Sequence, residues 1–308
     1  MSKDWAEEIT ERILKRGLLE SPLEVHDNGS SDRRGDLLLT GQAGICLILG
    51  AADTGKTTLA AALTGRLARS RAVGIIDADI GQSHIGPPTT VGWVVVDEPK
   101  VDFSQVTPGG ISFVGDVTPV GHLLQLTAAI TQCVQQVSKV TDLIIIDTPG
   151  FINGPAASAL WWTVQRILRP ELVLAVQRDN ELSGILAGLQ NLGPQIELIK
   201  ASPEIPTKSP QARRSYRQSQ FQKYFRDSQL YNISLSNMAI QAGWNLKGES
   251  LIGRLVALRD EKGIDVAIGI IDDRRDDNDM VVIKAPQLDI SRIRCLVIGD
   301  VSIDIAGE

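Results

Sequence analysis

The stretch Gly50-Ala-Ala-Asp-Thr-Gly55-Lys56-Thr57 decides the fold of this chain. It matches the pattern G-x-x-x-x-G-K-[ST], follows the apolar run 45–49 and opens a segment rich in alanine and leucine. Backbone amides at such a strand-to-helix turn form an anion site that glycine lets phosphates approach. We therefore predict that Lys56 reaches the β and γ phosphates of a nucleotide and that the Thr57 hydroxyl binds Mg²⁺. The predicted nucleotide-binding set is Gly50, Ala51, Ala52, Asp53, Thr54, Gly55, Lys56, Thr57 and Thr58.

Short apolar runs alternate with helix-like segments along most of the chain. Buried strands separated by helices are typical of an α/β fold with a mostly parallel sheet and helices on both faces. This is the architecture expected of a P-loop NTPase domain. We predict strands over residues 45–49, 72–77, 143–146, 172–176 and 196–199, and helices over residues 4–16, 56–69, 123–137, 156–168 and 182–192.

The pattern changes toward the C-terminus. Prolines 203, 206 and 210 precede a basic and aromatic run. From about residue 245 the sequence alternates as β-strands do, with turn signals at residues 260–263 and 272–279. We therefore expect an N-terminal helix and linker (1–34), a P-loop domain (35–230) and a small β-rich C-terminal domain (231–308).

Composition limits the classes of function. The chain has 308 residues and a net charge of −6, so a polyanion would have to bind a local basic patch. Cys46, Cys133 and Cys295 form no CxxC pair, which argues against a zinc site or a disulfide framework. The N-terminus lacks the apolar region of a signal peptide, and no apolar run is long enough to cross a bilayer. These features predict a cytoplasmic protein that does not enter a membrane.

Carboxylates follow two of the predicted strands. Asp77 and Asp79 follow the second strand, and Asp147 ends the third. At the edge of the sheet where the nucleotide lies, a carboxylate can hold magnesium or accept a proton from an attacking hydroxyl. The alternatives are that Asp77 caps a turn, that Asp79 is solvated and that Asp147 only ends a strand. The stretch 147–150 (DTPG) is also similar to a GTPase switch, although the chain has no N-K-x-D base-recognition motif.

A set of motifs in consistent order extends this interpretation over roughly residues 35–305. They are the P-loop, Asp77-Ala-Asp79-Ile-Gly81-Gln82, Pro87-Pro88-Thr89-Thr90, Phe113-Val-Gly115-Asp-Val-Thr118-Pro119, Asp147-Thr-Pro-Gly-Phe-Ile-Asn-Gly154 and Arg213-Arg214-Ser-Tyr-Arg217. In these motifs the chain resembles the polynucleotide 5′-hydroxyl kinases, the RNA kinases of tRNA splicing, 3′-end processing and ribosome biogenesis. Thr89 departs from the family pattern, because it stands where the substrate clasp P-G-T has glycine.

The resemblance implies roles for individual residues. Asp79 matches the general base that takes the proton of a 5′-hydroxyl, and the arginines fall in a lid over residues 205–227. The alternative for this basic segment is a solvated amphipathic helix. The residues expected to be catalytic are Lys56, Asp79, Arg213, Arg214 and Arg217. The expected substrate contacts are Asp77, Gln82, Pro88, Thr90, Thr148 and Trp161, and the expected metal ligands are Thr57, Asp77, Asp79 and Asp147.

Aromatic side chains and histidines near the motifs have more than one possible role. Trp161 or Trp162 could stack on a substrate base, a contact worth about 1–3 kcal/mol. Because adjacent helical residues face about 100° apart, at least one of the two belongs in the core. His84 and His122 are expected to be structural or surface residues, and the segment 177–181 is expected to border the adenine.

These features predict transfer of the γ-phosphate of ATP or GTP, with Mg²⁺, to the 5′-hydroxyl end of RNA or DNA, and a single-stranded end as the partner. Two alternatives stay open. One is a nucleotide-switch ATPase or GTPase that binds a partner without transferase activity. The other is a P-loop kinase of small molecules.

Overall fold

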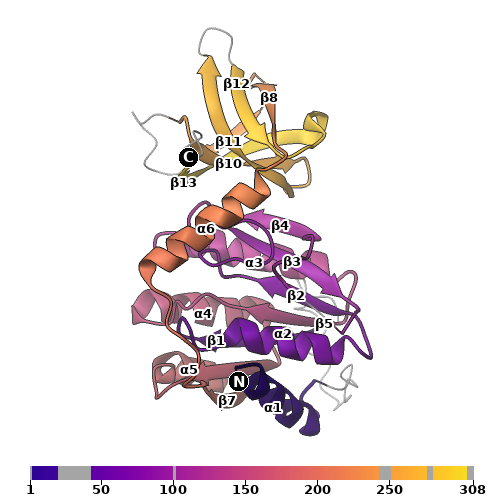
Figure 1. Cartoon of the computed structure of the whole chain (residues 1–308), viewed down its shortest axis with the longest axis vertical. Coiled ribbons are helices and arrows are strands. Elements are labelled where there is room, and N and C mark those ends of the chain that lie inside the picture. Colours follow the sequence, from indigo (N-terminus) through magenta and orange to yellow (C-terminus); the bar gives the residue numbers. More distant parts are fainter. Residues whose placement is uncertain are drawn as a thin grey trace.

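The structure is a computed structural model that describes residues 2–19, 43–99, 102–236, 238–242, 251–275 and 280–303. Most of the predicted linker and the end of the turn predicted at residues 272–279 lie outside these ranges. Figure 1 shows a layered α/β body that carries the N-terminal helix at one end and the C-terminal strands at the other. Among the described helices, none is long and apolar enough to span a bilayer.

Five parallel strands form the part of the sheet that holds the phosphate loop, in the order β7-β6-β1-β5-β2. All five predicted strands are confirmed. The register aligns the carboxyl ends of neighbouring strands, and it places Asp77 beside Asp147. The strands are β1 (Gly44–Gly50), β2 (Val73–Asp77), β5 (Leu143–Asp147), β6 (Leu172–Gln177) and β7 (Gln195–Lys200).

Helices cover both faces of these strands, which explains their unbroken apolar sequences. Leu47 and Leu49 pack in one hydrophobic core, whereas Cys46 and Ile48 pack in the other. The first core contains α3 (Leu123–Val137), α4 (Gly154–Leu168) and α5 (Ser183–Leu189), and the second contains α1 (Ser2–Lys15) and α2 (Lys56–Leu67). The 3-10 helix Gln190–Leu192 continues α5. The predicted helices are therefore confirmed, with α2 ending slightly earlier than predicted.

Two antiparallel strands that we did not predict extend the sheet past β2. They are β3 (Thr90–Val96) and β4 (Gly110–Phe113), and β4 meets the C-terminal strands where Ile111 pairs with Asp265. The motifs at residues 87–90 and 113–119 had been interpreted in terms of substrate binding alone. The apolar residues of TVGWVVV, which are typical of a strand, lie directly beside the first of them.

The C-terminal region is rich in β-strands, as predicted, and these strands are mainly antiparallel, although β13 pairs in parallel with β9. They pack around a separate apolar cluster that includes Val256, Leu258 and Ile283. Their bounds are β8 (Gln229–Ser234), β9 (Ala239–Ala242), β10 (Arg254–Asp260), β11 (Asp265–Arg275), β12 (Met280–Ala285) and β13 (Ile293–Ser302), with the 3-10 helix Ile290–Arg292 before β13.

Helix α6 (Pro210–Tyr224), within the predicted lid, connects the phosphate-loop region to the C-terminal strands (Figure 1). It begins with a Ser209 side chain that accepts the amide of Ala212, and with proline in its first turn. Its other end is anchored, because Phe221 is buried beside β4 and the C-terminal strands and the Ile268 amide donates to the Tyr224 hydroxyl over 3.0 Å. Helix α6 is therefore fixed at its C-terminal end.

Candidate active site

The phosphate loop is a tight turn between β1 and α2. Asp53 and Gly55 have positive φ values of 57° and 97°, which turn the backbone into the helix. A side chain at position 55 would be strained by this φ, and its Cβ would lie 2.4 Å from Ile205 Cδ1. Glycine is therefore required here both for the turn and for the close packing of the chain beyond β7.

Lys56 lies folded back over this loop. Its side chain is almost fully buried, and Nζ donates to the carbonyl oxygen of Ala51 over 2.7 Å. Burial lowers the pKa of Lys56, while the carboxylates of Asp147 and Asp79 oppose that shift. The ammonium group therefore lies at the mouth of the anion site and has one backbone acceptor.

Thr57 and Asp147 form a corner suited to a divalent cation. The Thr57 hydroxyl donates to Asp147 Oδ2 over 2.5 Å, whereas Asp147 Oδ1 is buried with no hydrogen-bond partner. Burial, together with the neighbouring charge of Asp77, raises the pKa of Asp147 to about 7. A hydroxyl beside an unpartnered buried carboxylate oxygen has the hard oxygen chemistry that Mg²⁺ prefers. The corner therefore fits the predicted metal.

Asp77 organises the loop that follows β2. Its carboxylate accepts the amides of Asp79 (3.0 Å), His84 (2.5 Å) and Ile85 (3.0 Å). Burial raises its pKa to about 7, although the bond from the His84 amide opposes that shift. These contacts correspond to the turn-capping alternative, and a role for Asp77 in binding metal or substrate stays a prediction.

Asp79 is the partly exposed carboxylate of this loop. Its Oδ1 accepts the amides of Gly81 (3.1 Å) and Gln82 (3.0 Å), which fixes the orientation of the group. Within the described part of the chain, Oδ2 has no hydrogen-bond partner. The geometry therefore leaves one carboxylate oxygen able to accept a proton from a bound hydroxyl.

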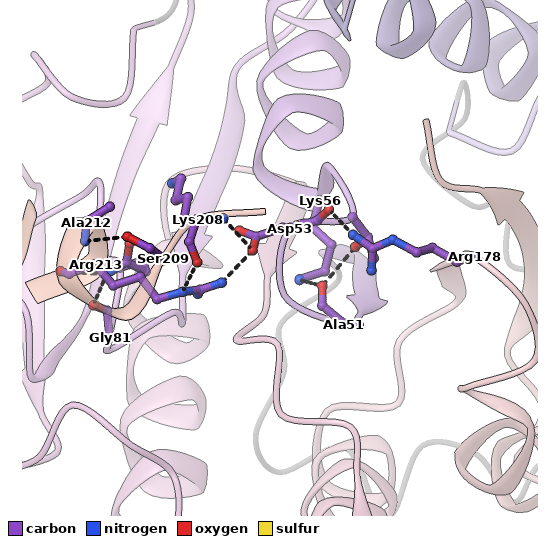
Figure 2. A network of polar contacts seen from close by, with 11 residues as sticks. Ala51, Asp53, Lys56, Gly81, Arg178, Lys208, Ser209, Ala212 and Arg213 are labelled. Carbon is purple, nitrogen blue, oxygen red and sulfur yellow. Dashed lines mark hydrogen bonds and ion pairs between the residues drawn. The ribbon is translucent and has the colours of Figure 1, made fainter. Parts of the chain in front are cut away.

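Of the three predicted lid arginines, Arg213 contacts the phosphate loop (Figure 2). Arg213 Nη2 lies 2.5 Å from Asp53 Oδ2 in the phosphate loop. Arg214 is exposed and Arg217 is half-buried, and neither pairs with an acid among the described residues. The structure thus brings Arg213 to the nucleotide site, while the roles of Arg214 and Arg217 stay predictions.

Comparisons with known proteins agree with this geometry. Residues 50–227 match the family model described as mRNA cleavage and polyadenylation factor CLP1 P-loop. The chain belongs to this family. It is 30% identical to a protein of Pyrococcus abyssi named polyribonucleotide 5′-hydroxyl-kinase, over 67% of this chain and 57% of that protein. A protein of the same name from Thermococcus kodakarensis is 26% identical over 85% of this chain and 89% of its own length.

Several of these matches are partial. The chain spans little more than half the length of the Pyrococcus relatives, including the Pyrococcus horikoshii kinase, of which it covers 56%. Among solved structures, the Clp1p chain of a Clp1p–Pcf11p complex is similar, with a TM-score of 0.62 and 12% identity over 84% of this chain and 74% of that one. That likeness concerns the fold.

One residue that we expected to contact substrate, Trp161, lies in the core instead. Trp161 is fully buried in the core on α4, where its indole nitrogen donates to the Phe151 carbonyl over 2.7 Å. It has no free face on which a base could stack, so the expectation of a substrate contact is wrong in this structure. Trp162 is 38% exposed, but its nitrogen donates to the Ile185 carbonyl.

The remaining predicted contacts are bonded to backbone. The hydroxyl of Thr90 donates to the Pro87 carbonyl and that of Thr148 to the Ile48 carbonyl, each over 2.7 Å. Pro88 is buried beside Thr90. The Gln82 amide donates to the Gly81 carbonyl over 2.7 Å and to the Arg213 carbonyl over 3.3 Å. Of these bonds, the last links the loop after β2 to α6.

Both histidines have structural contacts. His84 packs its ring 5.6 Å from that of Tyr216, and burial lowers its pKa. His122 Nε2 lies 2.9 Å from Asp300 Oδ2, a contact between the start of α3 and β13.

Sequence reasoning missed other contacts at this site. The Tyr216 hydroxyl donates to the Ser83 carbonyl over 3.0 Å, and the Lys208 amide donates to Asp53 Oδ2 over 3.1 Å. Arg178 Nη2 donates to the Asp53 carbonyl over 2.5 Å. Arg178 lies in the segment 177–181 that was expected to border the adenine, but its contact with the phosphate loop was not predicted, and backbone donors such as the Lys208 amide carry no sequence signal.

Thr89 is strained where the family motif has glycine. It has a φ of 73° and no exposed surface, and its hydroxyl is buried without a partner. A left-handed conformation costs a β-branched residue roughly 1–2 kcal/mol. Thr90, its neighbour, is equally buried but has ordinary φ and a bonded hydroxyl.

We expect Thr89→Gly to cost less stability than Thr90→Gly, by about 1 kcal/mol or more, because only the first change relieves strain. Urea unfolding of both variants measures the difference in the free energy of unfolding. An equal or larger loss for Thr89→Gly would show that the threonine side chain is well accommodated.

Proposed function

We propose that this chain is a polynucleotide 5′-hydroxyl kinase that transfers the γ-phosphate of ATP to the 5′-hydroxyl end of a polyribonucleotide. The observation that carries the proposal is the convergence on one sheet edge of Lys56, the Thr57–Asp147 corner, the open oxygen of Asp79 and Arg213. The names of the archaeal relatives support the same activity.

In the proposed reaction, Asp79 accepts the proton of the 5′-hydroxyl as that oxygen bonds to the γ-phosphorus. The bond from the γ-phosphorus to the β–γ bridging oxygen breaks, ADP leaves, and the proton passes from Asp79 to solvent. Lys56 and Arg213 offset negative charge on the transferring group. Magnesium held by Thr57 and Asp147 would neutralise charge on the β and γ oxygens. Since phosphoryl transfer needs little covalent chemistry from the protein, positioning accounts for most of the catalysis.

The substrate end reaches this site beside a local basic segment. Lys208 lies just before α6, and Arg213, Arg214 and Arg217 lie in its first half, so this segment is positively charged although the whole chain has a net charge of −6. Binding of a nucleic acid there should weaken with salt, because cations on the protein replace counterions on the phosphates. A single-stranded end fits the proposal, since the reacting hydroxyl must enter the loop region between β2 and α6.

The direct test is incubation with γ-labelled ATP or GTP and 5′-hydroxyl oligonucleotides. The panel contains RNA and DNA of several lengths, single- and double-stranded, with a mononucleoside and a 5′-phosphorylated RNA as controls. We expect label on the 5′-hydroxyl RNA and none on the phosphorylated control, with loss of label when EDTA removes magnesium. Equal labelling of the mononucleoside would indicate a small-molecule kinase. Nucleotide hydrolysis with no labelled acceptor would indicate a switch or binding module.

A lid prediction follows from the position of Arg213. We expect Arg213→Ala to lower turnover by about 10²-fold with little change in nucleotide affinity, because a guanidinium on the moving phosphoryl acts mainly in the transition state. Exposed Arg214 gives the comparison, and Arg214→Ala should lower turnover much less than Arg213→Ala, because Arg214 pairs with no acid of the phosphate loop among the described residues. Arg213→Lys should rescue poorly, since lysine lacks the planar fork. Equal small losses of affinity in both alanine variants, with turnover unchanged, would mean that the segment is only a solvated helix.

A further inference from the structure

Asp53 is an acid in a loop built to bind anions. A carboxylate so close to bound phosphates opposes their binding, so its presence needs another physical reason. Its side chain is 8% exposed, and Oδ2 accepts two donors from the lid segment, the Lys208 amide at 3.1 Å and Arg213 Nη2 at 2.5 Å. Thus the carboxylate is directed at the lid.

The Asp53 backbone is held from the opposite direction. Arg178, directly after β6, donates Nη2 to the Asp53 carbonyl over 2.5 Å. Figure 2 shows Arg178 on one side of the loop and Lys208 and Arg213 on the other. With its φ of 57°, Asp53 has the conformation that aspartate adopts more readily than most residues. The residue is therefore fixed on both sides as a rigid point of attachment.

The attachment extends to the acceptor side. The side-chain amide of Gln82 donates a hydrogen bond to the Arg213 carbonyl oxygen over 3.3 Å. Gln82 follows Asp79 in the same loop. One carboxylate thus connects the phosphate loop with the lid segment, and the lid segment connects with the loop that carries Asp79.

We propose that Asp53 is the positioning residue that docks the lid and holds the Arg213 guanidinium over the phosphate loop. The inference rests on the proposed kinase function and adds to it a role for an acid that the P-loop motif leaves unassigned. The backbone amide of Asp53 still serves the anion site, whereas its side chain acts through Arg213. The role predicts that loss of the carboxylate lowers turnover without weakening nucleotide binding.

The kinetic test compares Asp53→Asn in two backgrounds, wild type and Arg213→Ala. Asparagine keeps the size of the side chain and removes its charge. We expect turnover to fall about 10- to 100-fold in the wild-type background, the scale of a misplaced catalytic group, and nucleotide affinity to hold or rise. In the Arg213→Ala background the same substitution should change turnover by less than about twofold, because its effect passes through that arginine. Equal losses in both backgrounds, or a loss of nucleotide affinity, would overturn the proposal.

Hydrogen exchange supplies a readout that does not depend on kinase activity. In Asp53→Asn, with no nucleotide added, amides of residues 208–213 should exchange faster than in wild type, while those of α4 should not change. The matched control is Glu204→Gln, which removes an exposed charge just before the lid, and it should leave exchange and turnover as in wild type. If wild type phosphorylates no oligonucleotide, the proposed function fails, yet exchange still decides whether Asp53 docks the lid. Unchanged exchange at residues 208–213 would refute the docking.

Discussion

Lys56→Ala is expected to abolish phosphoryl transfer, with a loss of roughly 10³-fold or more, while the protein stays folded. The loss exceeds that for a single neutral donor in a charge-stabilising site because a full charge is removed beside the β and γ phosphates. The fold should survive, since among the described residues Nζ donates a single hydrogen bond, to the Ala51 carbonyl, and burial already disfavours the charged form.

The measurement is single-turnover transfer to a 5′-hydroxyl RNA, alongside thermal unfolding of each protein. Lys208→Ala is the matched control, because Lys208 lies nearby but directs Nζ over the Tyr216 ring at 5.7 Å and away from the phosphate loop. We expect a much smaller loss for this variant. A well-folded Lys56→Ala protein that keeps most of its activity would be incompatible with the P-loop mechanism.

The fold of the phosphate-loop region could be predicted because its signals are local. The run before Gly50 is apolar on both faces, and the residues after Gly55 are strong helix formers, so each segment indicates its own structure. Strands β3 and β4 were not predicted, because Thr90 was considered only as a substrate contact and β4 has four residues. An antiparallel extension of a parallel sheet leaves a weaker pattern than a βαβ unit.

The site was predictable in composition but not in its contacts. Asp147 was placed correctly beside Thr57, because a strand-end acid must meet the start of the P-loop helix. Trp161 was misjudged because a helix buried against a sheet can take a whole indole into its core. The connection from Asp53 to the lid could not be predicted. Asp53 lies 155 positions from Lys208 and 160 positions from Arg213, and no sequence pattern joins residues so far apart.

Asp77 and Asp79 have different structural roles, so we expect their asparagine variants to differ in stability and in turnover. Asp79→Asn keeps an oxygen for the amides of Gly81 and Gln82, so it should leave stability and nucleotide binding nearly unchanged. Asp77 uses both carboxylate oxygens as acceptors for buried amides, including that of His84. Asp77→Asn places an NH₂ group against at least one of them, which should cost about 1–3 kcal/mol of stability.

Turnover should show the opposite ranking. With its base removed, Asp79→Asn should transfer phosphate about 10²–10⁴ times more slowly than wild type, the usual contribution of general acid–base catalysis. Asp77→Asn, assayed well below its unfolding temperature, should lose less, because Asp77 acts by shaping the loop. Transfer to a 5′-hydroxyl RNA, nucleotide binding and urea unfolding of both variants give the comparison. A nearly silent Asp79→Asn beside a folded but inactive Asp77→Asn would mean that Asp77 is the base. That result would also require the loop to rearrange when substrate binds, because both oxygens of the buried Asp77 carboxylate are held by backbone amides.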